Sequence, residues 1–481
     1  MGKNKGAVEQ ITTRDQDFAQ WYTDICMKAE LADYSGVRGC MIVRPRGTAI
    51  WENIKSELDR RFKETGHSNV IMPLFIPESL LMKEAEHVEG FAPEVAWVTQ
   101  GGNEVLPERL AVRPTSETLF CTHYSKIIHS YRDLPVLYNQ WVSVVRWEKS
   151  TRPFLRTREF FWQEGHTAHA TSEDADQEAL RMLGVYRDVL ENILAIPCVP
   201  GMKSESEKFA GAKKTYTLET LMYDGQALQA ATSHHFGENF ARAFDITFQD
   251  ENGETKYVNS TSWGITTRTI GGMIMVHSDD RGLVLSPKVA PHKLILIPIA
   301  THKEGVMEAC DRLEDRLKKT FPMVVDRTDK SPGFKFADAE MKGYPLRLEM
   351  GPRDIEEGKV DVIRRDTLEK VSLALDDHLE EKLQDLLDVM QAEMLQRAKK
   401  RMEEKTHLAH SKEEFDRLIK EGGFVVAPWS GSAEVEKQIK EECQATIRCE
   451  SFENQKKDKS GLKDLWNGEE AKYLVHIARA Y

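Results

Sequence analysis

Residues 146–166 read RWEKSTRPFLRTREFFWQEGH, and the rest of the chain can be interpreted around them. Apolar and polar residues alternate on both sides of a polar loop, residues 150–154, which contains a Pro-Phe turn. This alternation predicts two antiparallel strands joined by a long hairpin. Charged and aromatic side chains surround the loop, and these are Arg146, Glu148, Arg156, Arg158 and Phe160.

The side chains around this loop match the chemical groups of a nucleotide. A guanidinium suits a phosphate, a carboxylate suits an exocyclic amine, and an aromatic face suits a purine. We therefore expect the hairpin to hold a nucleoside triphosphate in a bent form. The same residues also fit a salt-bridged hairpin with a hydrophobic face, and two further stretches favour the nucleotide.

A second stretch, residues 264–272, places an arginine where a strand passes into a helix. Arg268 is expected at the helix start, where free backbone N–H groups add to its attraction for an anion. Together with Arg146 it would grip one phosphate from two sides. Such a pair suits in-line attack at phosphorus, where catalysis depends on positioning and charge stabilisation. The sequence holds no Gly-x-x-x-x-Gly-Lys-Ser/Thr loop, which excludes P-loop chemistry.

A third stretch, residues 70–77, is predicted to be a strand interrupted by Pro73. Proline cannot donate a hydrogen bond to a neighbouring strand. We therefore expect this strand at the edge of a sheet or at an interface.

Composition describes a globular protein of several domains. The chain has 481 residues, 40% of them hydrophobic and 30% charged, which predicts roughly two to four domains. The net charge is −12, so a nucleic-acid partner must be recognised by local groups and shape rather than by overall charge. Seven cysteines are scattered without a Cys-x-x-Cys pair, as is usual in a reducing cytosol.

The sequence predicts a cytoplasmic protein without a membrane segment. Residues 1–10 lack the apolar core of a signal peptide, and Gly6 stands where an acylation signal needs Ser or Thr. The apolar run at 294–297 is far too short to cross a bilayer.

Hydrophobic spacing predicts alternating elements before residue 286. Helices are expected at 13–33, 46–65, 118–130, 173–193 and where the stretch 264–272 passes into a helix. Strands are expected at 41–43, 70–77, just before Pro114, at 136–142, as short segments within 196–260, and just before Gly264.

The pattern changes at Ser286-Pro287, and three domains are expected: 1–285, 286–400 and 401–481. After the change, strands at 294–300, 322–326, 345–350 and 359–365 alternate with helices at 303–319 and 334–342. This alternation is typical of an α/β domain. A long helix over 376–404 leads to a small α+β unit.

Four motifs give the chain a recognisable resemblance. They are Arg-Pro-Thr-Ser-Glu at 113–117, Arg-Thr-Arg-Glu-Phe at 156–160, Thr-Ser-His-His at 232–235 and Trp-Gly-Ile-Thr-Thr-Arg at 263–268. With these, residues 13–481 resemble a class II aminoacyl-tRNA synthetase, and among these the prolyl-tRNA synthetase family of the archaeal and eukaryotic-like type.

The resemblance implies an α+β fold class, with an antiparallel-sheet catalytic domain, an α/β anticodon-binding domain and a small α+β C-terminal domain. It implies a homodimer with the Pro73 strand near the interface. It also implies that L-proline reacts with ATP, accompanied by Mg²⁺, to give prolyl-adenylate, and that the prolyl group then passes to the terminal ribose of tRNA(Pro).

The same resemblance assigns expected roles. Arg146 and Arg268 would be catalytic. The proline site would consist of Thr115, Glu117, Arg146, Trp162, Glu164, His166 and His234. The ATP site would consist of Arg146, Glu148, Arg156, Thr157, Phe160, Gln229, Thr232, Thr266 and Arg268.

In the α/β domain, Glu340, Arg347 and Arg353 match positions that read the guanines of a proline anticodon in the family. Arginine is the bidentate partner of guanine O6 and N7, and glutamate accepts from a guanine amine. The family often has lysine at position 353, so Arg353 is a departure. A solvated charged face would explain the same residues.

Two further expectations concern what the chain lacks. Relatives often hold a structural zinc through four cysteines, but Ser430 and Val435 replace two of them, and Cys443 and Cys449 alone cannot close a tetrahedral site. We therefore expect no zinc. Only about 65 residues separate Glu164 from Gln229, so we expect no editing domain there and some mischarging with alanine.

The sequence leaves two other functions open. One is a synthetase for another amino acid, such as threonine or serine; Thr115, Glu117 and His234 without an evident metal site favour proline. The other is a non-catalytic RNA-binding paralogue, which the intact Arg146 and Arg268 disfavour. Tyr481 matches a tyrosine that lies towards the active site in relatives.

Overall fold

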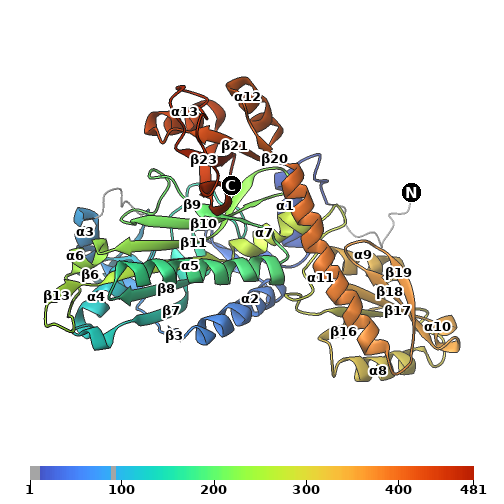
Figure 1. The fold of residues 1–481 in the computed structure, drawn as a ribbon. Helices are drawn as coiled ribbons and strands as arrows, with labels where there is room; N and C mark the ends of the chain where they lie inside the picture. The colour runs from blue at the N-terminus through green and yellow to red at the C-terminus, as the bar shows by residue number, and fades with distance from the viewer. Residues whose placement is uncertain (1–10, 88–93) are drawn as a thin grey trace.

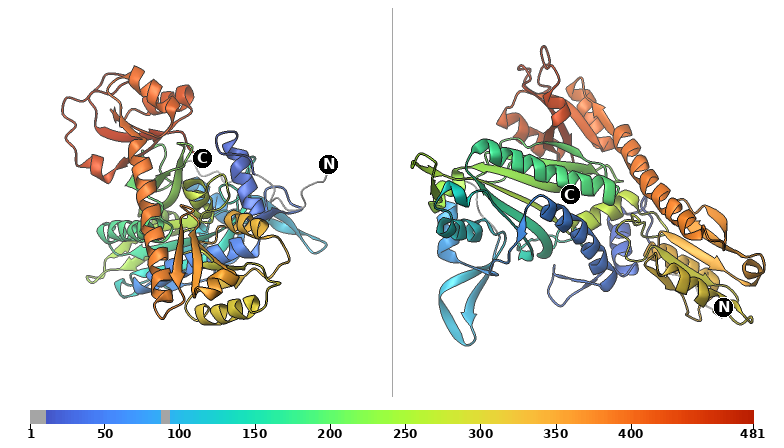
Figure 2. Two further views of the ribbon diagram at one scale, coloured as in Figure 1. Left: turned by 90° about the vertical axis from the view of Figure 1, so that its right-hand side faces the viewer. Right: turned by 60° about the horizontal axis from the view of Figure 1, so that its bottom comes forward.

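The computed structural model describes residues 11–87 and 94–481 of the chain. Residues 1–10, in which no signal peptide is expected, lie outside the described residues. Figure 1 shows a large sheet-based body, a small α/β domain beside it and a C-terminal unit above it. The long helix α11 (Leu379–Glu404) runs from the α/β domain to the C-terminal unit, and both views of Figure 2 place those two at opposite ends of it.

An antiparallel sheet forms the centre of the large body. Its strands, in spatial order, are β9 (Val199–Met202), β10 (Lys214–Leu221), β11 (Ala227–Gly237), β14 (Asn259–Thr266), β8 (Glu159–His169) and β7 (Val136–Val145). The predicted hairpin is confirmed, because β7 and β8 pair antiparallel as far as Val145 and Glu159. Gly165 of β8 lies against the buried ring of Trp263, where an added Cβ would come within 2.1 Å of the ring. Only glycine fits there.

Helices cover the sheet and bury the main hydrophobic core. They are α1 (Phe18–Lys28), α2 (Pro45–Glu64), α5 (Ser172–Asp188) and α7 (Arg268–His277). Trp21, Ile54, Phe62, Tyr186 and Trp263 are all buried in this core. Two of these helices, α1 and α5, are shorter than the hydrophobic spacing indicated.

The ends of α1 and α5 have local causes. The Asp17 side chain caps α1 by accepting from the N–H of Gln20, and Glu30 adopts a left-handed φ of 61° just beyond its end. After α5 the chain continues as a π-helical turn, Val189–Ile193. The predicted helix over 173–193 therefore combines two kinds of helix.

The strand predicted over 70–77 is reduced to its last three residues, 75–77, and these lie at a sheet edge as expected. Short β3 (Ser68–Asn69) pairs parallel with β7, whereas β4 (Phe75–Pro77) pairs with β6 (Glu104–Val112) in another sheet that includes β5 (Ala96–Gly101). Pro73 lies between β3 and β4 and has no N–H for a ladder. The N–H of Met72 donates instead to the side chain of Gln140, at 2.9 Å.

The α/β domain follows the predicted alternation. Its sheet has the order β16 (Met323–Val325), β15 (Leu294–Pro298), β17 (Leu346–Met350), β18 (Lys359–Arg364) and β19 (Lys370–Ala374). Helices α8 (Val306–Leu317) and α9 (Pro332–Lys342) pack on β15. Strand β19, which pairs antiparallel with β18, was not predicted.

The C-terminal unit continues the catalytic sheet. Its strands are β20 (Thr406–Leu408), β21 (Phe424–Trp429), β23 (Tyr473–Ala478) and β22 (Thr446–Ser451), and its helices include α12 (Lys412–Glu421) and α13 (Ala433–Cys443). Strand β22 pairs with β9, with Ser451 opposite Gly201. A Cβ at Gly201 would lie 2.5 Å from the Glu450 carbonyl oxygen. Within residues 11–87 and 94–481, every helix is too short or too polar to cross a membrane.

Buried histidines make the stability of this fold depend on pH. Burial lowers the pKa to about 3 for His234 and His277 and to about 4 for His169, His235 and His476. These rings stay neutral in the folded protein, whereas the unfolded chain takes up protons below about pH 6.5. Folding stability should therefore fall as the pH drops, by up to about 2 kcal/mol per ring between pH 6.5 and 5.

Urea unfolding at pH 7 and pH 5 tests this expectation. The unfolding midpoint should be lower at pH 5, and His277→Gln should reduce the difference between the two midpoints. Equal midpoints for the unmodified protein at the two pH values would contradict it.

Candidate active site

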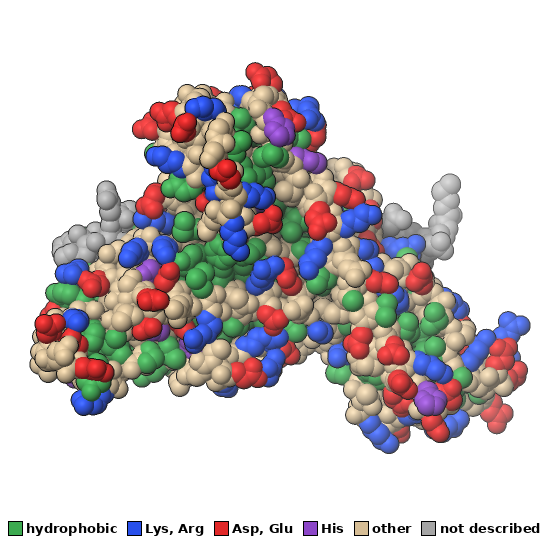
Figure 3. Space-filling view, in the orientation of Figure 1, with side chains coloured by type: hydrophobic (Ala, Val, Ile, Leu, Met, Phe, Trp, Pro, Cys, Tyr) green, Lys and Arg blue, Asp and Glu red, His purple; other side chains and the backbone are tan. Residues whose placement is uncertain are grey.

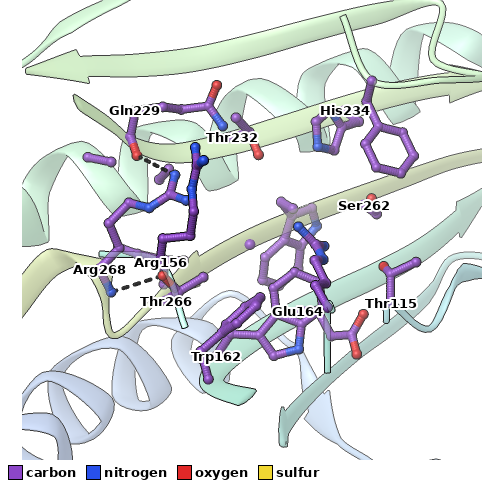
Figure 4. Close-up of a pocket in the computed structure, with 18 of the residues that line it drawn as sticks. Thr115, Arg156, Trp162, Glu164, Gln229, Thr232, His234, Ser262, Thr266 and Arg268 are labelled. Atoms are coloured by element: carbon purple, nitrogen blue, oxygen red, sulfur yellow. Dashed lines mark hydrogen bonds between the residues drawn. The ribbon is translucent and has the colours of Figure 1, made fainter. Parts of the chain in front are cut away.

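One cavity on the catalytic sheet contains all the residues expected to bind proline and ATP (Figure 4). They come from the hairpin loop, from β8, β11 and β14, and from the first turns of α4 (Glu117–Ile127) and α7. The residues are Thr115, Glu117, Arg146, Glu148, Arg156, Thr157, Phe160, Trp162, Glu164, His166, Gln229, Thr232, His234, Thr266 and Arg268. The structure thus brings together side chains that are more than 150 positions apart, as Thr115 and Arg268 are.

Arginines gather at one end of the cavity. Arg268 is the first residue of α7, as predicted, and its backbone N–H donates to Thr266 Oγ1 at 3.0 Å. Its guanidinium donates to the carbonyl oxygens of Leu155 and Gln229, at 3.1 and 3.4 Å. Figure 4 shows Arg156 beside it. Burial, followed by the charges of Arg146 and Arg156, lowers the pKa of Arg268 to about 10.

Arg268 therefore keeps its proton at neutral pH although other guanidiniums repel it. Such a cluster is stabilised when an anion enters, because each guanidinium then gains an opposite charge. The arginine end of the cavity is thus suited to phosphate.

Arg146 is held in the middle of the cavity. Its Nε donates to the Pro114 carbonyl oxygen at 3.0 Å, and its guanidinium carbon lies 5.5 Å from the ring centroids of both Phe160 and Trp162. Burial lowers the pKa of Arg146, and the neighbouring carboxylates Glu117, Glu164 and Glu148 oppose that effect. Packing against two rings and one hydrogen bond therefore hold this charge in place.

Glu164 lies at the opposite end, in a buried network. Its carboxylate accepts from Ser116 Oγ and from Gln140 Nε2, the latter at 2.6 Å, and lies 2.8 Å from His166 Nε2. The His166 ring stacks on Phe120, with centroids 4.1 Å apart. Burial raises the pKa of Glu164. The hydrogen bond and charge of His166, together with the hydrogen bonds from Ser116 and Gln140, outweigh burial and lower the pKa below its usual value.

Glu117 adds a second carboxylate at this end. It accepts hydrogen bonds from Thr115 Oγ1 and, at 3.3 Å, from Ser262 Oγ. Figure 4 shows Thr115, Glu164 and Ser262 on the side of the cavity away from Arg268. Two carboxylates and a hydroxyl beside one another are acceptors for a positively charged N–H donor.

His234 closes the same end as a neutral ring. Its Nδ1 lies 3.0 Å from Thr215 Oγ1, and its ring centroid lies 4.7 Å from that of Phe209. With a pKa of about 3, set by burial and then by His166, the ring carries no charge at neutral pH. It therefore does not repel a cation bound to the carboxylates.

Several cavity residues were missed in the sequence. They are Phe154, Leu155, Glu207, Phe209, Thr215 and Ser262 in the lining, with Ser116 and Gln140 behind Glu164. Ser262 pairs with His166 across two strands, so strand alternation could have placed it on the cavity face. Glu207 and Phe209 lie in an irregular connection and carry no such signal.

The residues expected to read the anticodon lie outside this cavity, in the α/β domain. Arg347 Nη1 lies 2.7 Å from Glu340 Oε1, and Arg281, which follows α7, lies 3.1 Å from Glu340 Oε2. Arg353, in the short helix α10 (Pro352–Glu356), is 85% exposed, and its side chain lies 3.7 Å from that of Glu357. The structure therefore brings Glu340 and Arg347 together and leaves Arg353 apart from that pair.

The C-terminal unit does not fit a structural zinc. Where relatives have a cysteine, Ser430 donates its hydroxyl and backbone N–H to the Asp464 carboxylate, at 2.7 and 2.8 Å. Cys443 and Cys449 are the two thiols in this unit, and a closed tetrahedral zinc site needs four ligands. The hydrogen bonds between Ser430 and Asp464 thus take the place that metal coordination would have in this unit.

Comparisons with known proteins cover each part of the chain. The model described as "tRNA synthetase class II core domain (G, H, P, S and T)" matches residues 102–277. "Anticodon binding domain" matches 293–386, and "Prolyl-tRNA synthetase, C-terminal" matches 412–481.

Full-length relatives are also similar. A proline–tRNA ligase of Ruminiclostridium cellulolyticum is 58% identical over 482 residues, covering 100% of both chains. One from Clostridium novyi is 56% identical over 482 residues, again covering 100% of both. One from Oceanobacillus iheyensis is 56% identical over 481 residues, covering 100% of this chain and 99% of the relative.

Proposed function

This chain belongs to the prolyl-tRNA synthetases, so it ligates proline to tRNA, and from that premise we propose the part that each cavity residue plays. The family resemblance, fold class and activity expected from the sequence are confirmed by the comparisons. One observation carries the assignment of roles. A single cavity has guanidiniums at one end and carboxylates at the other, matching the phosphates of ATP and the ammonium of proline.

We propose that proline binds at the carboxylate end. Its ammonium donates to Glu117 and to Thr115, which are already joined by a hydrogen bond, while neutral His234 leaves that charge unopposed. Its ring lies among Trp162, Glu164 and His166, which the network around Glu164 holds rigidly. The proline carboxylate then points to the centre of the cavity, where Arg146 lies.

ATP is proposed to occupy the arginine end. Arg268 and Arg146 hold the α-phosphate from two sides, and Arg156 and Thr157 hold the outer phosphates. Phe160 stacks on adenine and Glu148 accepts from its amine, while Gln229, Thr232 and Thr266 face the nucleotide's sugar and phosphate side. A proline carboxylate oxygen attacks the α-phosphorus and pyrophosphate leaves. The tRNA ribose hydroxyl later attacks the prolyl carbonyl and loses its proton, the bond between that carbonyl carbon and the phosphate oxygen breaks, and AMP leaves.

Mg²⁺ is proposed to arrive with ATP. Glu148 is the carboxylate of the cavity assigned to the nucleotide, and no group of three or more metal-ligating side chains occurs in residues 11–87 and 94–481. The residues present therefore fit an ion bound mainly to phosphate oxygens, with at most a carboxylate or water ligand from the protein. When bound, the ion neutralises phosphate charge.

The α/β domain is proposed to read the anticodon through Glu340, Arg347 and Arg353. Figure 3 shows acidic and basic side chains interspersed over this face of the molecule, so tRNA recognition must depend on such local groups. The Glu340–Arg347 pair is preorganised, because each holds the other in place at 2.7 Å. Guanine edges can then replace that contact with hydrogen bonds to both side chains.

Glu340→Ala should reduce aminoacylation of tRNA(Pro) by about tenfold to a hundredfold in kcat/KM, as expected for one lost base contact. It should leave proline-dependent pyrophosphate exchange unchanged, because exchange needs no tRNA. Glu314→Ala is a matched control, because Glu314 pairs with Arg327 in the same domain, at 2.5 Å, and neither residue is assigned to the anticodon. An equal loss of both activities in Glu340→Ala would contradict the anticodon role.

A homodimer and a cytoplasmic location are also proposed. Ile71 is 85% exposed, and Leu74, Phe75 and Met82 are exposed as well, which leaves an apolar surface around the Pro73 segment. A second copy of the chain covering this surface would remove it from water. Sedimentation of the purified protein should give twice the mass of one chain.

Pyrophosphate exchange with different amino acids tests the proposed site. Exchange should depend on L-proline, proceed weakly with alanine and be absent with threonine and serine. Glu117→Gln should raise the KM for proline without changing that for ATP. Exchange that follows threonine or serine instead would overturn the assignment of the carboxylate end.

A further inference from the structure

The connection between β9 and β10, residues 203–213, forms one wall of the cavity. Glu207 and Phe209 line the cavity from this connection, which contains neither helix nor strand. The Phe209 ring lies against His234, with centroids 4.7 Å apart, and its backbone N–H donates to Thr215 Oγ1 at 3.0 Å. The wall therefore stands over the carboxylate end, where His234 lies in Figure 4.

The first residues of this wall are fastened to the C-terminal unit. Ser204 Oγ donates to Glu436 Oε1 of α13 at 2.5 Å, and both residues are only 9% exposed. The two positions are 232 residues apart in the chain. Figure 1 shows the C-terminal unit standing above β9 and β10, which is the edge from which the wall emerges.

A second tie lies beside the first. Lys203 Nζ and Arg448 Nε lie 2.8 and 2.9 Å from the two oxygens of the Glu219 carboxylate, which is completely buried. Burial raises the pKa of Glu219, but Lys203 and Arg448 outweigh it and hold the pKa at about 2. Because Arg448 comes from β22, the C-terminal unit supplies one of the two cations that pair with this buried carboxylate.

We propose that Glu436 and Arg448 are positioning residues of the active site, through which the C-terminal unit holds residues 203–209 as the wall of the proline pocket. The proposal rests on the assignment of proline to the carboxylate end. An irregular connection keeps its geometry only when its ends are fixed, and here both ties act on its first two residues. The C-terminal unit, which does not fit a zinc ion, thereby serves substrate binding.

The contacts between the C-terminal unit and residues 203–209 should affect the binding of proline more than the binding of ATP. When the start of the wall is released, Phe209 spends less time packed on His234, so the ring of bound proline is less enclosed. The arginine end depends on Leu155 and Gln229, which belong to the hairpin loop and β11. The KM for proline should therefore rise while the KM for ATP stays the same.

A double-mutant cycle tests the tie in the full-length protein by pyrophosphate exchange. Ser204→Ala and Glu436→Ala should each raise the KM for proline about fivefold to tenfold, the effect of losing one charged hydrogen bond. The double variant should be no worse than either single one, because all three remove the same contact. Glu436→Gln should retain a KM close to that of the unmodified protein, because its amide oxygen can accept from Ser204.

Ser411→Ala serves as the matched control. Ser411 caps α12 in the same unit by accepting from the N–H of Glu414 at 3.1 Å. It should lower the unfolding temperature as Ser204→Ala does, with no change in the KM for proline. The tie is overturned if Ser411→Ala raises that KM equally, or if Ser204→Ala and Glu436→Ala leave it unchanged. A failure of the proline site itself would instead appear in Glu117→Gln, whose KM for proline would stay unchanged.

Discussion

Arg146→Ala should lower kcat/KM for proline-dependent pyrophosphate exchange by about a thousandfold or more, the effect expected for removing charge stabilisation from a buried reaction centre. Arg146 lies between the two ends of the cavity, held by the Pro114 carbonyl oxygen and by the rings of Phe160 and Trp162. Both reactants bring a negative charge to this point. Without the guanidinium, no positive charge would lie between the proline carboxylate and the α-phosphate, and the two negative groups would repel each other.

Exchange kinetics and tRNA binding separate this effect from a loss of folding. Arg146→Ala should bind tRNA(Pro) with nearly unchanged affinity, because Glu340 and Arg347 lie in another domain. Arg146→Lys should recover only part of the activity, since one ammonium cannot replace a planar fork with several donors. Normal exchange in Arg146→Ala would refute the role assigned to Arg146.

Arg268→Ala should reduce kcat/KM for ATP in exchange by about a hundredfold to a thousandfold. Arg268 begins α7, so its side chain and the free N–H groups of the helix start attract the same anion. Its guanidinium is fixed by the carbonyl oxygens of Leu155 and Gln229 before the nucleotide arrives. Alanine would remove this preorganised charge, whereas the KM for proline should change little.

The matched control for this change lies at the other end of the same helix. Arg401 is a partly buried arginine that donates to the Val276 carbonyl oxygen at 2.7 Å, near the end of α7 and outside the cavity. Arg401→Ala should lower stability without a comparable loss of exchange. If Arg401→Ala and Arg268→Ala reduce exchange equally, Arg268 acts by stabilising α7 and not by binding the nucleotide, and the role assigned to it is contradicted.

Residues with regular spacing made the site predictable from the sequence. Alternation on both sides of the loop placed β7 and β8, and the stretch from Gly264 to Gly272 marked the passage from β14 into α7. Where a strand fixes which way a side chain points, alternate residues such as Trp162 and Glu164 fall on one face. The substrate cavity could therefore be drawn from the hairpin together with the four motifs.

Contacts that depend on the whole fold could not be predicted. Ser116 and Gln140 surround Glu164 from different elements, and nothing in their local sequence marks them. Phe209 lies in an irregular connection, and Ser204 at the start of that connection contacts Glu436, which is 232 residues away. The pairing of β22 with β9 also joins two regions that were expected to be separate domains, 1–285 and 401–481. The edge of a sheet can pair with any strand of suitable geometry, so local sequence does not indicate this contact.

Local pattern also misplaced one strand. Residues 70–77 have the composition of a strand, but Pro73 cannot join a ladder, and Met72 donates to Gln140 instead. The hydrophobic side chains that indicated a strand are exposed at Ile71, Leu74 and Phe75. Their exposure fits the proposed subunit contact, to which Phe75 would contribute from the edge strand β4.

A crystal structure with an unreactive analogue of prolyl-adenylate is the most direct measurement of how this cavity works. The account predicts that the phosphoryl group of the analogue lies within hydrogen-bonding distance of both Arg146 and Arg268, with the proline ammonium at Glu117 and Thr115. It is contradicted if the analogue binds elsewhere and both guanidiniums turn outward into solvent.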